Sequence, residues 1–180
     1  FGTGPSLSKY LDRDFGDGHC IVVNSMVANH AMLDKLKPLA ICACDPIFHA
    51  GCSGYAEAFR TSLINAMERY DCHTFVPTRD YAQYAACLPP ALLEKVIAVP
   101  IIGEAPINVD LTDQFYFKSA ANVLTLAVFP LCATIAEETR VLGCDGRPIF
   151  QDEYYWKHDK TAQFNDKMEN IKTVHPSFFS

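Results

Sequence analysis

Short apolar runs alternate along the chain with longer segments of helical periodicity. The runs show no strong alternation of apolar and polar positions, which is typical of strands covered by helices on both faces of a parallel sheet. Five such strands are predicted, at residues 19–24, 39–44, 73–76, 95–99 and 139–142.

Helical patterns occupy the segments between these runs, at residues 27–37, 54–70, 79–87 and 119–136. Within 54–70 the apolar positions recur every three to four residues, with Phe59, Leu63 and Met67 on one stripe. Pro130 predicts a kink or an early end of the last helix, because proline has no N–H to donate. Strands that alternate with helices at this spacing predict an α/β fold with a mostly parallel sheet.

Length and composition fit one compact domain over residues 1–180. The chain has 180 residues, of which 49% are hydrophobic and 20% are charged. No apolar run approaches the roughly 18 residues that a membrane helix needs, and no signal sequence stands at the start. Transmembrane and secreted proteins are therefore disfavoured. Because the chain opens without a methionine and stops within what looks like a motif, we expect truncation at either end.

The net charge and the cysteine content indicate which classes of partner and which cellular compartment to expect. With 15 Lys and Arg against 21 Asp and Glu, the formal charge of -6 gives no footprint for a nucleic-acid polymer, so small molecules are the expected partners. The 8 cysteines form no CxxC pair and show no zinc-site spacing. We interpret them as reduced, buried thiols rather than disulfides, which predicts a cytoplasmic protein.

The composition of the chain changes after residue 149. Three aromatic residues, Tyr154, Tyr155 and Trp156, are followed by a polar, charged stretch that ends at Lys172. Mobile covers of active sites are often built from such segments. Residues 149–172 are therefore predicted to form a surface lid or a helical insertion.

A glycine-rich turn opens the chain where a first strand would pass into a helix. Gly2 and Gly4 would let backbone N–H groups approach a phosphate or a ribose, and the helix start after Pro5 and Ser6 favours negative charge. The spacing is neither the dinucleotide-binding fingerprint nor the P-loop. A tight turn with Pro5 or Ser6 at a helix start is the alternative.

Polar residues follow several of the predicted strands. Asn24, Asp45 and Asp145 each stand after an apolar run, at the carboxyl edge where open α/β sheets bind ligands. Asn24 is suited to a base or a sugar, and Asp45 to a hydroxyl or, less favourably, a metal. Both are equally good helix caps, and Asp145-Gly146 is also a common turn, so these alternatives stay open.

Groups for proton and phosphate chemistry lie near the end of the chain. Arg147, Tyr154 and Tyr155 offer a cation and two phenols for a leaving phosphate, or else belong to a buried aromatic cluster. Histidine is the residue type best placed to exchange a proton near neutrality. His175 precedes a proline and follows the predicted lid, which would present it to a cleft, whereas His158 lies in the polar stretch.

The order of these motifs resembles the bacterial sialyltransferases of glycosyltransferase family 42 and related domains of polysaccharide gene clusters. The resemblance spans most of the chain, and its most distinctive part is the opening Gly-x-Gly-Pro-Ser-Leu. Further matching motifs follow in order, namely Asn24, Asp45-Pro46, Lys118-Ser119, Gly143-x-Asp145, the tyrosine pair and His175.

The resemblance implies a single Rossmann-like α/β domain with a lid. It also implies polysaccharide biosynthesis with CMP-sialic acid as donor, no essential metal, a glycan acceptor, and inversion at the anomeric carbon. By the same resemblance His175 is the general base and Tyr154 and Tyr155 hold the leaving phosphate, to which the residue chemistry above adds Arg147 as a cation. The implied nucleotide- and donor-binding residues are Gly2, Gly4, Pro5, Ser6, Asn24, Ser119, Gly143 and Asp145, and the position of Asp45 after a strand adds it to the predicted nucleotide site.

The sequence departs from the family at positions that bear more on the identity of the transferred sugar than on the identity of the nucleotide. Gly146-Arg147 replaces aromatic residues, Lys118 replaces a threonine, and the segment between Ser119 and Gly143 is longer. Archaeal 6-hydroxymethylpterin diphosphokinases share a similar opening and an Asp-Pro. That alternative implies diphosphate transfer from ATP with Mg²⁺ held by Asp45. A nucleotide-binding module without chemistry is a third hypothesis, and peripheral association with the inner face of the membrane and a homo-oligomer also stay open.

Overall fold

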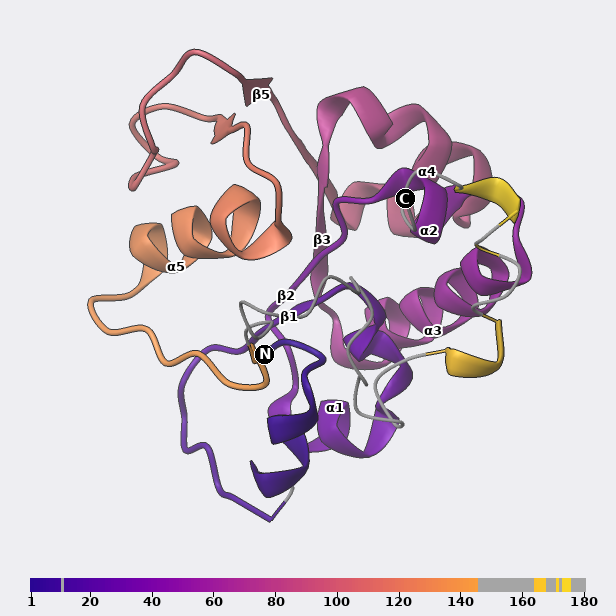
Figure 1. Cartoon of the computed structure of the whole chain (residues 1–180). Coiled ribbons are helices and arrows are strands. Elements are labelled where there is room, and N and C mark those ends of the chain that lie inside the picture. The colour runs from indigo at the N-terminus through magenta and orange to yellow at the C-terminus, as the bar shows by residue number, and fades with distance from the viewer. Residues whose placement is uncertain (11, 146–163, 168–170, 172, 176–180) are drawn as a thin grey trace, which may run out of the picture.

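The computed structural model describes residues 1–10, 12–145, 164–167, 171 and 173–175, and forms a mixed α/β fold (Figure 1). Four strands make a parallel sheet in the order β1-β2-β3-β4. They are β1 (Ile21–Val23), β2 (Ala40–Cys42), β3 (His73–Pro77) and β4 (Val96–Val99). A second, two-stranded parallel sheet joins β5 (Ile101–Ile102) to β6 (Phe117–Lys118).

Five α-helices connect or follow the strands among the described residues. They are α1 (His30–Leu36), α2 (Pro46–Ala50), α3 (Gly54–Tyr70), α4 (Tyr81–Cys87) and α5 (Phe129–Ile135). Short 3₁₀ segments add Pro5–Tyr10, Asn24–Ala28, Thr78–Asp80, Pro90–Lys95 and Asn165–Lys167.

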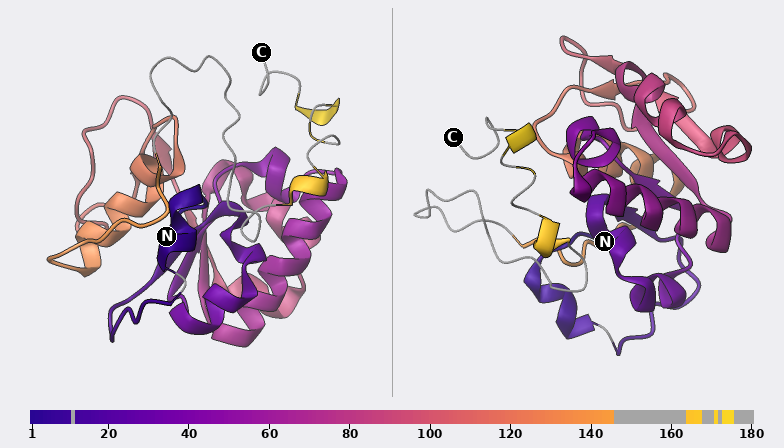
Figure 2. Two further views of the ribbon diagram at one scale, coloured as in Figure 1. Left: turned by 60° about the horizontal axis from the view of Figure 1, so that its bottom comes forward. Right: turned by 90° about the vertical axis from the view of Figure 1, so that its right-hand side faces the viewer.

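One face of the sheet packs against α1, α3 and α4. Val22, Ile41 and Val76 point into this layer, where the apolar stripe of α3 and the ring of Tyr84 are buried with them. The predicted stripe of residues 54–70 is confirmed, since Phe59, Leu63 and Met67 are fully buried. The layers are seen edge-on in Figure 1, and the right-hand view of Figure 2 looks onto the helices of this layer.

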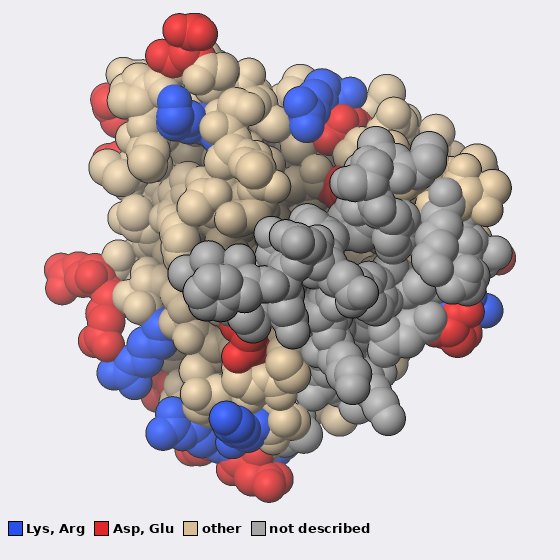
Figure 3. Space-filling model, viewed as in Figure 1, with Lys and Arg blue, Asp and Glu red and all other residues tan. Residues whose placement is uncertain are grey.

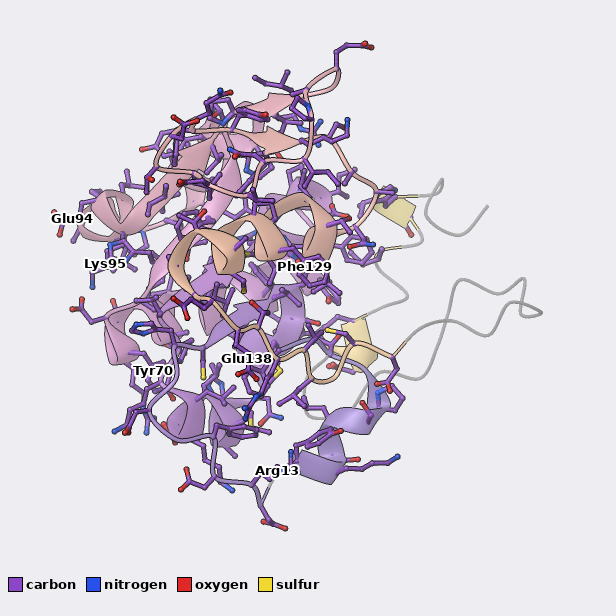
Figure 4. All side chains as sticks on the ribbon, turned by 90° about the vertical axis from the view of Figure 1, so that its left-hand side faces the viewer. Arg13, Tyr70, Glu94, Lys95, Phe129 and Glu138 are labelled. Atoms are coloured by element: carbon purple, nitrogen blue, oxygen red, sulfur yellow. The ribbon has the colours of Figure 1, made fainter. Side chains whose placement is uncertain are left out.

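The opposite face of the sheet is covered by α5 and the turn before it. Because side chains alternate along a strand, Ile21, Val23 and Cys42 point to this side, where they meet Leu126 and Leu131. Figure 4 shows α5 in front of the sheet, with Phe129 on it. The prediction of a parallel sheet with helices on both faces is therefore confirmed.

The opening residues extend the sheet beyond β1. The nitrogen of Phe1 donates to the carbonyl of Ile21 at 2.6 Å, and the carbonyl of Phe1 accepts the N–H of Val23 at 3.2 Å. On their other side, the N–H of Gly2 donates to the carbonyl of Leu142 at 2.8 Å. The glycine-rich turn therefore lies between the end of β1 and residues 142–145.

Some predicted elements are wrong. Residues 139–142 form no strand, because residues 139–141 are exposed and only the carbonyl of Leu142 is used in pairing. The last long helix starts near Val123 rather than at residue 119. Asn122 caps this start, because its side-chain oxygen accepts the N–H groups of Leu124 and Thr125. Pro130 does not end this helix. A π-helical turn, Leu124–Val128, precedes it, which accommodates a residue that has no N–H.

Other features were not predicted or lie outside the described residues. The pair β5–β6 and the short helix α2 are too short to leave a periodic pattern in the sequence. Most of the predicted lid, residues 149–172, lies outside the described residues. All eight cysteines are free thiols: Cys20, Cys42 and Cys72 are buried, Cys52 is exposed, and the others are half-buried. No helix among the described residues has the length and apolar character to cross a membrane.

Candidate functional site

The glycine-rich turn and the turn at residues 143–145 are bound directly to each other. The N–H of Gly4 donates to the carbonyl of Gly143 at 2.7 Å, and the N–H of Ser6 donates to Oδ2 of Asp145 at 2.9 Å. Two motifs that are about 140 residues apart in the sequence thus form one unit beside β1. Their common position at one edge of the sheet, which the sequence predicted, is present in the structure.

The two glycines of the opening turn are required by close packing. A Cβ on Gly2 would lie 2.5 Å from the carbonyl oxygen of Gly143, and a Cβ on Gly4 would overlap the Asp145 carboxylate. Gly143 itself has a φ of 65°, in the left-handed region that favours glycine. The N–H groups of Gly2, Gly4 and Ser6 are donated within the chain, so for them the tight-turn alternative describes the structure better than a phosphate contact.

Gly4→Ala is expected to lower the free energy of unfolding by about 1–3 kcal/mol, because its Cβ displaces the Asp145 carboxylate from the Ser6 N–H. Gly103→Ala is the matched control, since a Cβ there meets no atom within 4 Å. Urea denaturation of both variants measures the difference. Equal stability of the two variants would show that the contact between the turns is not tight.

Asn24 stands at the carboxyl end of β1 in a left-handed conformation, with a φ of 46°. This conformation is uncommon for a residue other than glycine, although asparagine tolerates it best. Its side-chain Oδ1 is buried and has no hydrogen-bond partner in the described part of the chain. The structure does not use Asn24 as a side-chain helix cap, which was the alternative to ligand binding; Asn29 caps α1 instead.

Asp45, at the end of the second strand, caps α2. Its Oδ1 accepts the N–H groups of Ile47 at 3.1 Å and of Phe48 at 3.2 Å. Asp45 therefore acts as a helix cap, which was one of its two predicted roles, and Pro46 occupies the first position of the helix. One carboxylate oxygen is thereby committed to the backbone.

A buried polar network holds the chain between β2 and α2. Nδ1 of His49 lies 3.1 Å from the hydroxyl of Tyr84 and 3.3 Å from the N–H of Asp45, and the Tyr84 hydroxyl is 3.0 Å from the carbonyl of Ala43. The His49 ring stacks on Phe59 with centroids 4.0 Å apart. Burial lowers the pKa of His49 from 6.5 to about 3, so this imidazole is neutral and structural.

The folded protein is expected to lose stability as the pH falls from about 6.5 towards 3. In this window the unfolded chain binds a proton at His49 that the folded chain does not, so the free energy of unfolding decreases by up to about 1.4 kcal/mol per pH unit. Urea denaturation of the wild type and His49→Gln between pH 7 and 5 measures this, and the variant should show the shallower dependence. Parallel pH dependences would contradict a neutral, buried His49.

A third strand end carries polar groups that the sequence analysis did not single out. Asp80, three residues after β3, has a side chain that is only 7% exposed, with Oδ1 3.5 Å from Nε of Arg79 and Oδ2 without a partner in the described residues. Burial raises the pKa of Asp80, while Arg79 opposes the shift. Burial and the Asp80 charge together raise the pKa of the Cys44 thiol to about 12, which makes it a poor nucleophile.

The signal for Asp80 was available in the sequence. Asp80 follows a predicted strand, as Asn24 and Asp45 do. Because residues 79–87 were predicted to be a helix, Asp80 was counted as part of its first turn and not as a residue at a strand end. A buried acceptor without a donor is unfavourable, and its presence is explained by local strain, by a catalytic role, or by a water or ion that supplies the missing hydrogen bond.

His175 lies beside α2. Its ring centroid is 5.7 Å from that of Phe48, and its N–H donates to the carbonyl of Ile171 at 2.8 Å. Ile171 is fully buried in the core, which fixes this part of the C-terminal segment against the domain. In Figure 4 the described C-terminal pieces lie on the opposite side of the molecule from Tyr70 and Lys95, which precede β3 and β4.

Other predicted site residues are not joined to this edge by the described contacts. Ser119 is exposed after β6, and its N–H donates to the carbonyl of Ile102 at 3.1 Å. The ammonium of Lys118 donates to the carbonyls of Gly103 and Ala105. Four further predicted residues, Arg147, Tyr154, Tyr155 and His158, lie outside the described residues.

Charge and metal ligands give no further site in the described part of the chain. On the face seen in Figure 3, acidic side chains lie close to the basic ones among the described residues. No group of three or more His, Cys, Asp or Glu side chains in the described ranges is arranged to hold a metal ion. Comparisons of the chain with protein-family models, curated proteins and solved structures found no match in any of the three.

Proposed function

We propose that this protein is an inverting glycosyltransferase that moves a sugar from a CMP-activated donor to a hydroxyl of a glycan acceptor. The observation that carries the proposal is the convergence of the glycine-rich turn, the Gly143–Asp145 turn and Asn24 at the carboxyl edge of a parallel sheet. Open α/β sheets bind ligands at this edge. The same motifs carry the resemblance to the family 42 sialyltransferases.

In the proposed reaction, Asn24 meets the nucleotide. Its buried Oδ1, which lacks a donor in the described residues, is suited to an amino or hydroxyl group of the nucleoside. The two turns form the wall beside it, and the side chains of Tyr154, Tyr155 and Arg147 are assigned to the leaving phosphate. A Rossmann-like domain with a lid over residues 149–172 belongs to this proposal.

His175 is the proposed general base. It accepts the proton of the acceptor hydroxyl while the acceptor oxygen bonds to the anomeric carbon from the face opposite CMP. The bond between that carbon and the phosphate oxygen breaks, and CMP leaves with the electron pair. The position of His175 against α2, the helix that Asp45 caps, supports this role because α2 begins at the carboxyl edge of the sheet.

The diphosphokinase alternative requires Asp45 as a ligand of Mg²⁺. The capping of α2 uses Oδ1 of Asp45 and leaves Oδ2 for a cation, so the cap by itself does not decide between the two activities. No described contact favours the diphosphokinase over the transferase.

A thermal-shift screen with CMP, CDP, UDP, GDP and ATP, each with and without Mg²⁺, tests the proposal. A ligand at about 100 times its dissociation constant stabilises the fold by roughly 2.7 kcal/mol, which is several degrees for a domain of this size. CMP should give the largest shift, and Mg²⁺ should not change it. A shift only with ATP and Mg²⁺ would support the diphosphokinase, and CMP binding without turnover would support the non-catalytic module.

A further inference from the structure

Four aromatic side chains in successive contact join the C-terminal segment to α2 and α3. Phe164 packs edge-on against Tyr55 with centroids 5.3 Å apart, Tyr55 packs edge-on against Phe48 at 5.2 Å, and Phe48 meets His175 at 5.7 Å with the planes tilted by 54°. Tyr55 and Phe48 are almost fully buried. Two points of the C-terminal segment, Phe164 and His175, therefore rest on a pair of rings that belong to α2 and α3.

Phe48 is itself held at the site edge. Its backbone N–H donates to the Asp45 carboxylate, and the helix α2, which follows Asp45 and contains Phe48, is less than one and a half turns long. The N–H of Asp45 in turn meets the buried imidazole of His49 at 3.3 Å. Asp45 therefore fixes the backbone of Phe48, and Tyr55 fixes its ring.

We propose that Phe48 is a positioning residue for His175, and that Asp45 acts through Phe48 by capping α2. The effect on catalysis rests on the function proposed above, whereas the geometry does not. The Phe48 ring restricts the rotation of the imidazole that it packs against, and the Ile171 carbonyl holds the His175 backbone. A base that is held in one orientation reacts faster than one that samples many, because small displacements from the reactive geometry have large effects on rate.

The first test is spectroscopic and needs no activity. In the full chain labelled at its six histidines, the signal of the His175 ring is assigned by its loss in His175→Gln. Phe48→Leu removes the ring current and should move this signal. Phe59→Leu is the matched control for loss of packing, because Phe59 is a fully buried ring that stacks on His49, and it should leave the signal in place.

The second test separates the cap from the charge at Asp45. Asparagine caps helices as well as aspartate does, whereas alanine does not. Asp45→Ala should therefore move the His175 signal, and Asp45→Asn should leave it in place. Equal displacement by both variants would overturn the role of the cap.

The third test is kinetic. With a CMP-sugar donor, Phe48→Leu should lower kcat roughly 10- to 100-fold with little change in the KM of the donor, and Phe48→Tyr, which keeps the ring, should restore kcat. An unmoved His175 signal in Phe48→Leu, or a matching displacement in Phe59→Leu, would overturn the positioning role. Absence of transfer by the wild type would count against the proposed function, while the spectroscopic result would still decide the role of Phe48.

Discussion

Replacing His175 with alanine should lower turnover of a CMP-sugar donor by roughly 10² to 10⁴, with the affinity for CMP nearly unchanged. The acceptor hydroxyl has to lose its proton as it attacks, and a positioned imidazole accepts it near neutral pH. His175 lies against Phe48 rather than in the core, so its removal leaves the buried network of His49 and Tyr84 intact.

Steady-state kinetics at saturating donor and acceptor, from pH 5 to 8, measure this effect. His30→Ala is the matched control, because His30 is an exposed residue at the start of α1. Equal turnover of His175→Ala and wild type would remove His175 from the mechanism and make His158 the next candidate. A loss of CMP affinity as large as the loss of kcat would instead indicate a structural role.

Phe59→Ala should lower the free energy of unfolding by about 3–5 kcal/mol. Phe59 is fully buried on α3, within the layer that covers one face of the sheet, and its ring stacks on His49 at 4.0 Å. The substitution removes apolar contacts and leaves a cavity next to the network that holds the chain after β2.

Urea denaturation measures the loss, and Phe115→Ala is the control because half of the Phe115 side chain is exposed. The control should lose less than about 1 kcal/mol. Similar losses in the two variants would contradict the packing of α3 on the sheet.

The fold could be predicted wherever an element buries a continuous apolar surface. Residues 54–70 form α3 with the predicted ends, because Ser53 caps the start through the N–H of Ala56 and Asp71 ends the helix with a φ of 54°. The predicted strand at 139–142 does not form: residues 139–141 are exposed, and among the described residues only the carbonyl of Leu142 pairs with a neighbouring backbone segment. The π-helical turn before Pro130 depends on hydrogen-bond register, which composition does not encode.

In the candidate site, too, some features could be predicted from the sequence and others could not. Strand ends predicted a common edge for Asn24 and Asp45, since parallel strands end on one side of a sheet. Asp145 lies beside the glycine-rich turn through its bond to the Ser6 N–H, although the strand predicted before it does not form. The sequence could not show that the Gly4 and Ser6 N–H groups are used within the chain, because their partners come from residues 143–145. Nor could it show that Phe48 reaches His175, which depends on how two distant segments pack.

Calorimetric titration of CMP into the full chain in EDTA tests the proposed nucleotide site most directly. Saturable binding at one site per chain is expected, and Asn24→Ala should weaken it by roughly 10-fold or more, since the buried Oδ1 of Asn24 would no longer meet the nucleotide. No binding of CMP, or binding that appears only after Mg²⁺ is added, would contradict the assignment of this sheet edge to a CMP-activated donor.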